Sequence, residues 1–580
     1  MEKVDKTIKL IKENKWIHYG IIIVIGIILS LPLANIQIRD THDGVLHLLR
    51  LIGTVDTLKI GQIPPLVNQN YCNGSGYAMN LFYAPLVTYI PLIIKLFTNS
   101  YSIALKIFGG LCIVLSGITM YHFMYSVTKN RIIAIFSSIF YMAAPYKLAN
   151  VYKRYAIGEF TASIFIPFVF MGLYNLFEQR GKKHYFIAIG AIGLALSHSV
   201  TTEYIALFCL VYILLNIKKL KEKVIVKKII INVIFIILIT LFFYLPLIEA
   251  TSSADYTITN NDKMMTNGES AQANTISFLE LFVFNDSRQE GWEVTAIIGI
   301  ITTVILISTM FVGKNVESNY KSFYMINIIF ALVSIFMASI LFPWKIMPSF
   351  LCKLQFPWRM IGFSTFFISF ICGINLYIIL KKITKRDVIR ILVVITLSVT
   401  MITESIIIMS KFYTKDNTLD EKYESSILEN PKISHMRINR DYMPYKALVL
   451  QNTYVLERED RTYVLNGNTE IIEENKNDLT DVVKIQNSKK GDILEFPYYY
   501  YVGYDLKIET GNKMVTSKPV ESGNGYLSYI LTEDMENAII TVNYNGTTIQ
   551  KVSYIVSAIS IILFTVYIIK ETKTSGENND

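Results

Sequence analysis

Long apolar runs alternate with short basic segments along most of this 580-residue chain. Windows of about 20 nearly uncharged residues recur, which is the length that an α-helix needs to cross a bilayer. Hydrophobic residues make up 52% of the chain and charged residues only 17%, which is less charge than a soluble protein carries. The pattern predicts a polytopic α-helical membrane protein. Its first apolar segment, 16–36, is too long for a removable signal peptide, so we expect it to stay as a helix.

Lysine and arginine in the short loops predict the orientation, because they are enriched on the cytoplasmic side of membrane proteins. They gather in a basic N-terminus, 1–15, and in four loops: 129–131, 180–183, 218–228 and 381–390. The apolar segment 82–97 is short and holds Pro85 and Pro91. If it crossed the bilayer, the later basic loops would face outward, so we expect it to lie in the outer interface.

About twelve spans follow from this reading, with both termini in the cytoplasm. They are 16–36, 101–127, 131–149, 160–178, 184–199, 200–217, 228–248, 294–313, 321–342, 358–380, 387–410 and 552–570. The membrane domain is therefore 16–410, and the last span lies in 551–570, before a short cytoplasmic tail at 571–580. Four outer loops are expected, at 37–100, 147–159, 249–293 and 343–357.

The composition changes between residues 411 and 550, where charged residues return. Runs that alternate apolar and polar positions appear there, among them "KALVLQ", "RTYVLNG" and "AIITVNYNG". Asn-Gly pairs, which favour tight turns, separate several of them. We predict a β-rich extracytoplasmic domain at 411–550, tied to the membrane at both ends.

The net charge of +9 does not indicate nucleic-acid binding, because the basic residues lie in loops between apolar segments. The five cysteines have no metal-ligand spacing; only Cys72 and Cys352 could both face outward and pair. Phosphate-loop, GxSxG, HExxH and CxxC motifs are absent from the sequence. The Ile, Lys, Asn and Tyr bias is typical of an AT-rich bacterium.

The stretch "RDTHDGVLHLLRL", residues 39–51, places unusual charge at a predicted membrane edge. If it is helical, Asp40, Asp43, His47 and Arg50 lie within an arc of roughly 80°. One interpretation is an amphipathic interfacial helix whose charges meet water or headgroups. The other is a catalytic face, in which a carboxylate near a low-dielectric surface acts as general base and Arg50 binds a phosphate.

Three further clusters lie at predicted outer ends. In "YKRYAIGEF", Lys153 and Arg154 could bind an anion beside Glu159, or Arg154 and Glu159 could simply form an interfacial ion pair. In "LQFPWRM", Arg359 is either an anchor in the aromatic belt or a phosphate clamp.

In "LSHSVTTE", His198 stands near Glu203, and its role is structural or functional. Because all the charged clusters face the same side, together they indicate an outward-facing site that uses carboxylates and holds a phosphate. A lipid-borne phosphate would enter this site sideways from the leaflet.

The segments "THDGVLHLLR", "GYAMNLFYAPL", "YKRYAIGEFTA" and "FPWRM" resemble the bacterial integral-membrane proteins known as 6-pyruvoyl-tetrahydropterin synthase-related. These are similar to YfhO-type membrane glycosyltransferases and to the glycosyltransferase C (GT-C) superfamily. The literal synthase activity is not expected, because that soluble enzyme needs a zinc site of histidines, which His42 and His47 do not match. The resemblance implies a GT-C-like membrane fold and an inverting glycosyltransferase in the bacterial plasma membrane, with its active site outside.

In that superfamily an acid in the first outer loop is the usual base, a position that Asp43 and Asp40 match. Glu159 matches a second acid, and His47 would orient the base. Arg50, Lys153, Arg154, Arg359 and His198 would bind the substrate or its phosphate. No metal is expected to be required, because the leaving phosphate is already charged, although the acids could accept a divalent cation.

The expected partners are the lipid bilayer, a polyprenyl-phosphate-linked sugar, and a cell-wall polymer, glycolipid or protein as acceptor. The alternatives are a transporter or flippase of lipid-linked envelope glycans, or an assembly protein that binds through its outer domain. Transport would need polar residues near mid-span, where this chain is mostly apolar.

Overall fold

The structure is a computed structural model that describes residues 14–179, 181–260, 267–282, 297–384, 387–410, 418–429, 440–449, 458–477 and 480–577. Almost all of the predicted cytoplasmic N-terminus, 1–15, lies outside these residues. So do parts of the predicted outer loop 249–293 and of the predicted outer domain.

Within the described residues, seven helical segments are long and apolar enough to cross a membrane. They are Lys15–Asn35 (α2 and a 3-10 turn), Tyr101–Thr128 (α6), Ile157–Glu178 (α9, Ile157–Ala162, and α10, Ile166–Glu178), Lys223–Ser253 (α13), Ser318–Ala338 (α18), Pro357–Ile383 (containing α20, Met360–Ile383) and Thr548–Lys573 (within α26, Thr548–Glu577). An eighth is added if α7 (Arg131–Met142) and α8 (Pro145–Tyr152) form one span, bent by 46°.

The other four predicted spans also coincide with helices, but their apolar parts are shorter. They are α11 (Phe186–Ala195), α12 (Ser199–Leu215), the segment Ile300–Asn315, which begins with α16 (Ile300–Ile307), and Ile395–Ile407 within α21 (Asp387–Ser410). The chain is therefore polytopic and mostly helical, as its apolar pattern predicts.

Small residues allow the helices to pack closely. A Cβ on Gly373 of α20 would lie 1.9 Å from Ser137 Oγ of α7, and one on Gly172 of α10 would lie 2.3 Å from Ile187 N of α11. Such close approach is how apolar helices gain packing energy in a membrane, where burial from water does not drive association. Substituting either glycine would push two helices apart.

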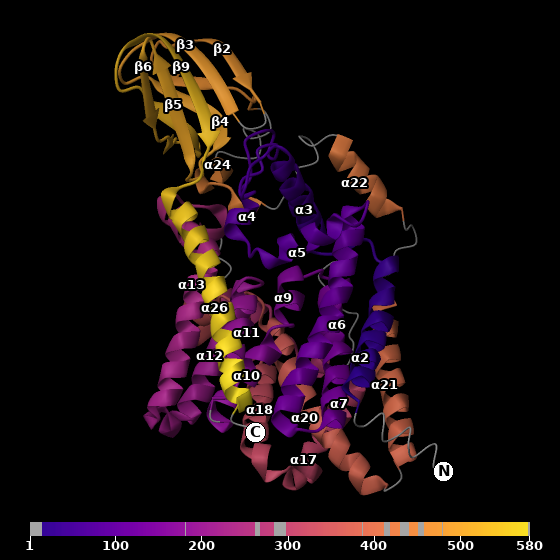
Figure 1. The fold of residues 1–580 in the computed structure, drawn as a ribbon. Helices are drawn as coiled ribbons and strands as arrows, with labels where there is room; N and C mark the ends of the chain where they lie inside the picture. Colours follow the sequence, from indigo (N-terminus) through magenta and orange to yellow (C-terminus); the bar gives the residue numbers. More distant parts are fainter. Residues whose placement is uncertain are drawn as a thin grey trace.

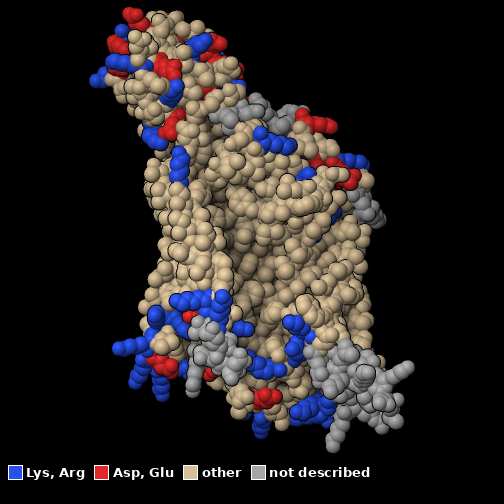
Figure 2. Space-filling model, in the orientation of Figure 1, with Lys and Arg blue, Asp and Glu red and all other residues tan. Residues whose placement is uncertain are grey.

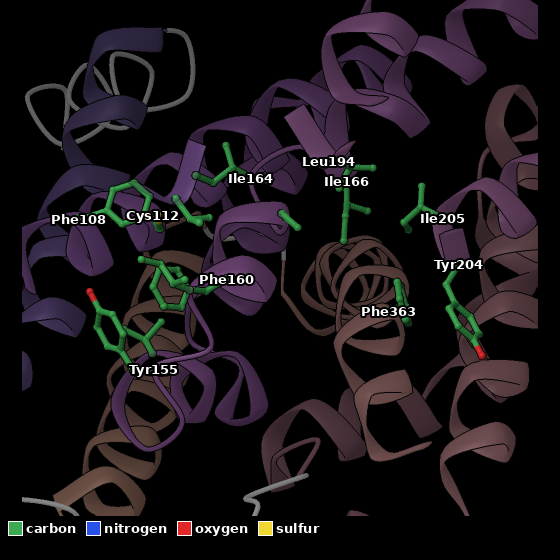
Figure 3. Packing of buried hydrophobic residues seen from close by; sticks show 14 of the residues in the cluster. Phe108, Cys112, Tyr155, Phe160, Ile164, Ile166, Leu194, Tyr204, Ile205 and Phe363 are labelled. Carbon is green, nitrogen blue, oxygen red and sulfur yellow. The ribbon is translucent and has the colours of Figure 1, made fainter. Parts of the chain in front are cut away.

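The short helix α9 is packed into the middle of this bundle (Figure 3). Its Phe160 lies with its ring centroid 6.1 Å from that of Phe108 on α6 and 5.5 Å from that of Tyr155. The Tyr155 hydroxyl donates to Leu105 O of α6 at 2.6 Å. These contacts fix the start of α9, which carries Glu159 of the charged cluster described below.

The segment predicted to lie in the interface, 82–97, contains α5 (Leu86–Lys95) and begins at the end of α4 (Met79–Phe82). Ten residues of α-helix extend about 15 Å, too short to cross a bilayer. With α3 (Gly44–Lys59), α5 lies at the end of the helical body nearest the strands (Figure 1).

Within the part of the chain that the structure describes, nine strands form two antiparallel sheets. They lie beyond that end of the helical body (Figure 1). One sheet has the order β1-β4-β8-β7 and the other β2-β3-β9-β5-β6. The strands are β1 (Tyr463–Asn466), β2 (Glu470–Lys476), β3 (Thr480–Ser488), β4 (Ile493–Tyr499), β5 (Tyr504–Thr510), β6 (Lys513–Ser517), β7 (Val520–Glu521), β8 (Tyr526–Ile530) and β9 (Met535–Tyr544). "RTYVLNG" and "AIITVNYNG" thus contribute strands, as predicted.

The prediction was wrong for "KALVLQ", which contributes to a helix, α24 (Tyr445–Val449). Pro444 precedes it and forms an isolated bridge with Tyr256, and Tyr445 N–H donates to Asp255 O at 2.8 Å. These contacts with the residues that follow α13 outweigh the alternating pattern of the six-residue run. A further helix, α22 (Leu419–Glu429), also lies in the stretch predicted to be β-rich.

Aromatic side chains join the sheets to the helical body. The ring of Tyr256 stacks on Tyr501 at 5.8 Å between centroids, and Phe82 stacks on Tyr442 at 5.4 Å. Tyr501 OH also donates to Tyr442 O at 2.9 Å. Since these rings come from α4, from the segment just after α13 and from the strand region, the sheets are held against the helices.

On the face shown in Figure 2, charged residues gather at the two ends of the molecule, and the surface between them is almost free of charge. Lysine and arginine dominate the end that faces away from the sheets. Cys72 and Cys352, the predicted candidates for pairing, are both free.

Candidate functional site

Residues 39–51 do not form the single helix that the spacing predicts. Ile38–Asp40 is a turn of 3-10 helix, and α3 begins only at Gly44. Thr41 Oγ1 donates to Ile38 O at 2.6 Å and accepts from Gly44 N–H at 3.1 Å, so its hydroxyl competes with the helical pattern. A Cβ on Gly44 would lie 2.1 Å from Ile38 O, so glycine is needed for this turn.

The turn separates the two aspartates. Asp40 is 44% exposed, and Arg39 Nε lies 3.4 Å from its Oδ1. Asp43 instead lies against the second predicted outer loop, where its N–H donates to Arg154 O at 2.9 Å. His42 N–H donates to Lys153 O at 3.2 Å in the same way. Backbone pairing therefore brings Asp43 to the charged residues that follow α8.

Asp43 is half-buried at the N-terminal end of α3, and it does not cap that helix with its side chain. Within the described residues, no hydrogen bond or ion pair to its carboxylate is found. Burial raises the pKa of Asp43, and the nearby charge of Glu159 adds to this, although Arg154 and Arg359 oppose it. A carboxylate with free lone pairs and a raised pKa is suited to accept a proton.

Glu159 has the opposite environment, because both of its carboxylate oxygens have polar or charged partners. Oε1 lies 3.0 Å from Arg154 Nη1 and 3.0 Å from Arg359 Nε, while Oε2 accepts from Tyr146 OH and Asn150 Nδ2, each at 3.1 Å. A buried carboxylate with two arginines stays ionised and is a poor base. Glu159 is therefore the anchor of the cluster and not its proton acceptor.

The two arginines are also held by aromatic rings and polar atoms. Arg154 lies 4.4 Å from the centroid of the Trp358 ring, and its Nη1 donates to Asn150 Oδ1 at 2.6 Å. Arg359 lies 4.9 Å from the Phe356 ring, and its Nη1 donates to Leu354 O at 3.0 Å. Cation–π contacts and ion pairs to the same carboxylate of Glu159 fix two positive charges side by side.

His198 approaches the same carboxylate from the start of α12. Its Nδ1 accepts from Thr201 N–H at 3.2 Å, so it caps the helix. The proton of the neutral ring therefore lies on Nε2. A Cβ on Gly158 would lie 2.7 Å from His198 Cδ2, which shows how closely the ring packs against the residue before Glu159.

A cavity of about 510 Å³, its open mouth included, lies beside Glu159. Its lining includes Tyr146, Lys147, Asn150, Glu159, His198 and Arg359. The surface is also hollowed in its uncharged middle, beside the column that contains α13 and α26 (Figure 2). An amphiphilic ligand could place a polar head near the cluster and an apolar tail along the helices.

Lys147, Tyr146 and Asn150 are site residues that the sequence patterns did not single out. Lys147 is buried, its Nζ donates to Ser116 Oγ, and it lies 3.8 Å from the centroid of the Tyr141 ring. A lysine inside an apolar stretch, just after the Ala-Pro that breaks α7 from α8, was the available signal. It adds an amine to the cavity wall beside Arg359, whereas Arg154 and Asp43 are not among the lining residues.

Other predicted residues lie away from this cavity. Arg50 Nε donates to Asn80 Oδ1, and its Nη2 donates to Tyr83 O and Ala84 O. The His47 ring packs edge-on against Tyr83 at 5.5 Å. Lys153 is partly exposed and does not line the cavity.

Burial lowers the pKa of His47 to about 3, so its ring is neutral. Within the described residues, His47 forms no hydrogen bond with the Asp43 carboxylate, so its predicted orienting role has no geometric support.

Among the residues that the structure describes, no group of three or more His, Cys, Asp or Glu side chains could hold a metal ion.

Comparison with known proteins gives two matches. Residues 81–412 match the model of a family described as "6-pyruvoyl-tetrahydropterin synthase related domain; membrane protein". A protein of Lactococcus lactis subsp. cremoris (strain MG1363), named "Uncharacterized protein", is 29% identical over 362 residues, which cover 60% of this chain and 57% of that protein. The chain thus spans little more than half of that relative's length. No solved structure matches the chain.

Proposed function

The chain belongs to the 6-pyruvoyl-tetrahydropterin synthase related family of membrane proteins, and on that basis we propose that it is a glycosyltransferase that takes a sugar from a polyprenyl-phosphate carrier. The acceptor would be a cell-wall polymer, glycolipid or protein of the cell envelope. One observation carries the proposal. The half-buried carboxylate of Asp43, with no hydrogen-bond partner among the described residues, lies near two arginines that form ion pairs with Glu159.

In the proposed reaction, Asp43 takes the proton of an acceptor hydroxyl as its oxygen attacks the anomeric carbon. The bond between that carbon and the phosphate oxygen breaks, and its electron pair leaves with the polyprenyl phosphate. A single base on the acceptor side gives inversion at the anomeric carbon. Arg154 and Arg359 stabilise the charge that develops on the leaving phosphate, because they are fixed before the reaction begins. Lys147 offers a hydrogen-bond donor from the cavity wall.

We propose that the end with the sheets faces outward from a bacterial plasma membrane. The gathering of lysine and arginine at the opposite end supports this orientation, since such residues favour the cytoplasmic side (Figure 2). A Thr98→Cys variant, made after replacement of the five native cysteines, should react with an impermeant maleimide on intact cells. If Thr98→Cys is labelled only after cell lysis, residue 98 faces the cytoplasm and the proposed orientation is wrong.

The test of the reaction uses purified full-length protein, a polyprenyl-phosphate-linked sugar as donor and sugar release as readout. Asp43→Asn should lower the rate at least 100-fold, in the range of lost base catalysis. Asp40→Asn is the matched control, since it removes the same charge three residues away, and should keep most of the activity. Full activity in Asp43→Asn would end the base assignment.

One observation favours transport of lipid-linked glycans as the second candidate. Lys147 is a buried polar residue within the bent α7–α8 segment, where a transport path would need polar groups. Reconstituted vesicles discriminate between the two functions. Transport predicts that a labelled lipid-linked glycan crosses the bilayer without loss of its sugar, whereas transfer predicts that the sugar is released.

A further inference from the structure

A second cavity lies between α3 and the loop that leads to α4, and it shares no lining residue with the cavity beside Glu159. It has about 230 Å³ of empty space, with its mouth included. The polar residues of its wall are Arg50, Thr54, Asn68, Tyr71, Tyr77 and Asn80. Its wall contains no acidic side chain.

Arg50 brings a positive charge into this wall. The residue is 3% exposed, and its three hydrogen bonds come from Nε and Nη2. Nη1 is buried and has no hydrogen-bond acceptor in the structure. Among the described residues, no carboxylate forms an ion pair with Arg50. Burial lowers its pKa to about 10, so the guanidinium still carries its charge at neutral pH.

Asn68 presents a second free donor. Its Oδ1 accepts from Asn70 N–H at 3.1 Å, and its backbone is paired with Tyr77 in both directions, at 3.0 and 2.8 Å. Its Nδ2 therefore points away from Asn70. Within the described residues, this buried Nδ2 has no hydrogen-bond acceptor. A Cβ on Gly53 would lie 2.2 Å from Asn68 Nδ2, so only glycine at that position leaves room for the amide.

The electrostatics of this wall favour an anion over water. Two carbonyl groups and the Tyr83 ring, 4.6 Å from the guanidinium, offset part of the Arg50 charge. Nη1 nevertheless points its two N–H groups at no acceptor, and an uncompensated buried charge is costly. A water molecule could accept from the donors but would leave the charge unbalanced, whereas an anion would satisfy both.

We propose that this cavity, formed by Arg50, Asn68 and Gly53, binds a small inorganic anion of the chloride or orthophosphate class. Only the Nη1 end of Arg50 is free, so the contact is to a single atom and not a planar clamp around a large group. The anion would join α3 to the loop before α4 and so stabilise the first outer region. The proposal does not depend on the proposed transfer reaction.

The test measures the melting temperature of the full-length detergent-solubilised protein during titration at constant ionic strength. Sodium gluconate is replaced by sodium chloride in one series and by sodium phosphate in another. We expect a saturable rise of about 2 °C or more with at least one of the two small anions, since a ligand that binds only the folded state stabilises it by mass action. A response to phosphate alone assigns an oxyanion.

Two substitutions make the test specific. Asn68→Leu should weaken the apparent anion affinity at least tenfold, and Asn68→Asp should abolish the anion response, because it places a fixed carboxylate opposite Arg50. Asn70→Asp adds the same charge two residues away, outside the wall, and should keep the response. The site is excluded if no anion gives a saturable shift, or if Asn68→Asp responds as the unsubstituted protein does.

Discussion

Arg359 Nε lies 3.0 Å from Glu159 Oε1, so the turn before α20 is joined to the first turn of α9. Arg154 Nη1 contacts the same oxygen at the same distance. One carboxylate oxygen thus fixes two guanidinium groups that come from different parts of the chain. The predictions below concern this junction, the aspartate beside it and the segments that support them.

Replacing Glu159 by Gln should destabilise the protein by about 3 to 5 kcal/mol, because two buried arginines would lose their shared counter-charge. The measurement is the denaturation midpoint of the detergent-solubilised full chain. Glu178→Gln is the matched control: its ion pair with Lys219 is about one-third exposed and should cost less than about 1 kcal/mol. Equal costs for the two variants would show that Glu159 is not the anchor.

The pH dependence of sugar release should show the raised pKa of Asp43. A base must be deprotonated to act, so activity should fall as the pH is lowered through the pKa of Asp43, above the usual range of an aspartate. Burial is the main cause of that rise, and Arg359 opposes it. Arg359→Gln should therefore move the acidic limb to higher pH. A limb that stays in place would show that Asp43 does not titrate in it.

Two substitutions of His198 should separate its capping role from its role in the cavity. His198→Ala removes the acceptor of Thr201 N–H and should cost about 1 kcal/mol, as for other lost caps. His198→Asn keeps a capping acceptor and should melt within a degree or two of the unsubstituted protein. If His198→Asn is as stable as the unsubstituted protein but inactive in sugar release, the imidazole itself contributes to the reaction. If both variants are active, it serves only as a cap.

The acidic residues of α22 should hold the loop before α3. Asp420 accepts from the N–H groups of Ile38 and Arg39 at 3.0 and 3.2 Å and pairs with Lys106 at 3.1 Å. Asp420→Ala should increase amide hydrogen exchange at Ile38 at least tenfold, which corresponds to about 1.4 kcal/mol. Glu421→Ala changes an exposed neighbour and should leave that rate unchanged.

Asp481 should make the sheets less stable as the pH rises. It is fully buried in β3, and burial raises its pKa, helped by the charge of Glu474, although Lys476 opposes the rise. The folded state therefore binds the proton more tightly than the unfolded state. Stability contributed by the protonated acid is complete below the unfolded pKa, near 4, and is lost as the pH rises through the folded value.

Asp481→Asn should consequently raise the melting temperature at pH 8 and change it little at pH 4. Thermal unfolding of the full chain at both pH values measures the difference. Asp534→Asn is a useful control, because Asp534 lies on the surface and pairs with Lys489. A pH-independent effect of Asp481→Asn would indicate that the buried carboxylate stays charged.

The apolar pattern predicted the helical segments, because these depend on length and local composition. It also predicted that the segment containing α5 is too short to cross a bilayer, and α5 has only ten residues. The Arg154–Glu159 ion pair was also one of the two stated alternatives, and the structure contains it. The sequence could not show that Asp43 lies at the charged cluster whereas Asp40 is exposed and lies away from it. This difference depends on the hydroxyl of Thr41 and on backbone pairing with a loop more than 100 residues away.

The direction of Arg50 and the inclusion of Lys147 were likewise beyond reach from sequence. Helical spacing places Arg50 on the same face as Asp43, but the turn at Thr41 removes Asp40 from that face. Arg50 is then drawn to the carbonyl groups of Tyr83 and Ala84. Lys147 reads as one lysine in an apolar stretch, and only the packing of α8 against α6 buries it in a cavity wall.

The chain passes from β9 to α26 through only three residues, 545–547, which span at most about 10 Å. Tyr256 and Tyr442 hold the sheets at a second point. A connection this short cannot absorb tension. If the sheets grip a polymer of the envelope, a pull on that polymer acts on α26 and on its neighbour α13 almost undiminished. Movement of the sheets would then be transmitted directly to these two helices.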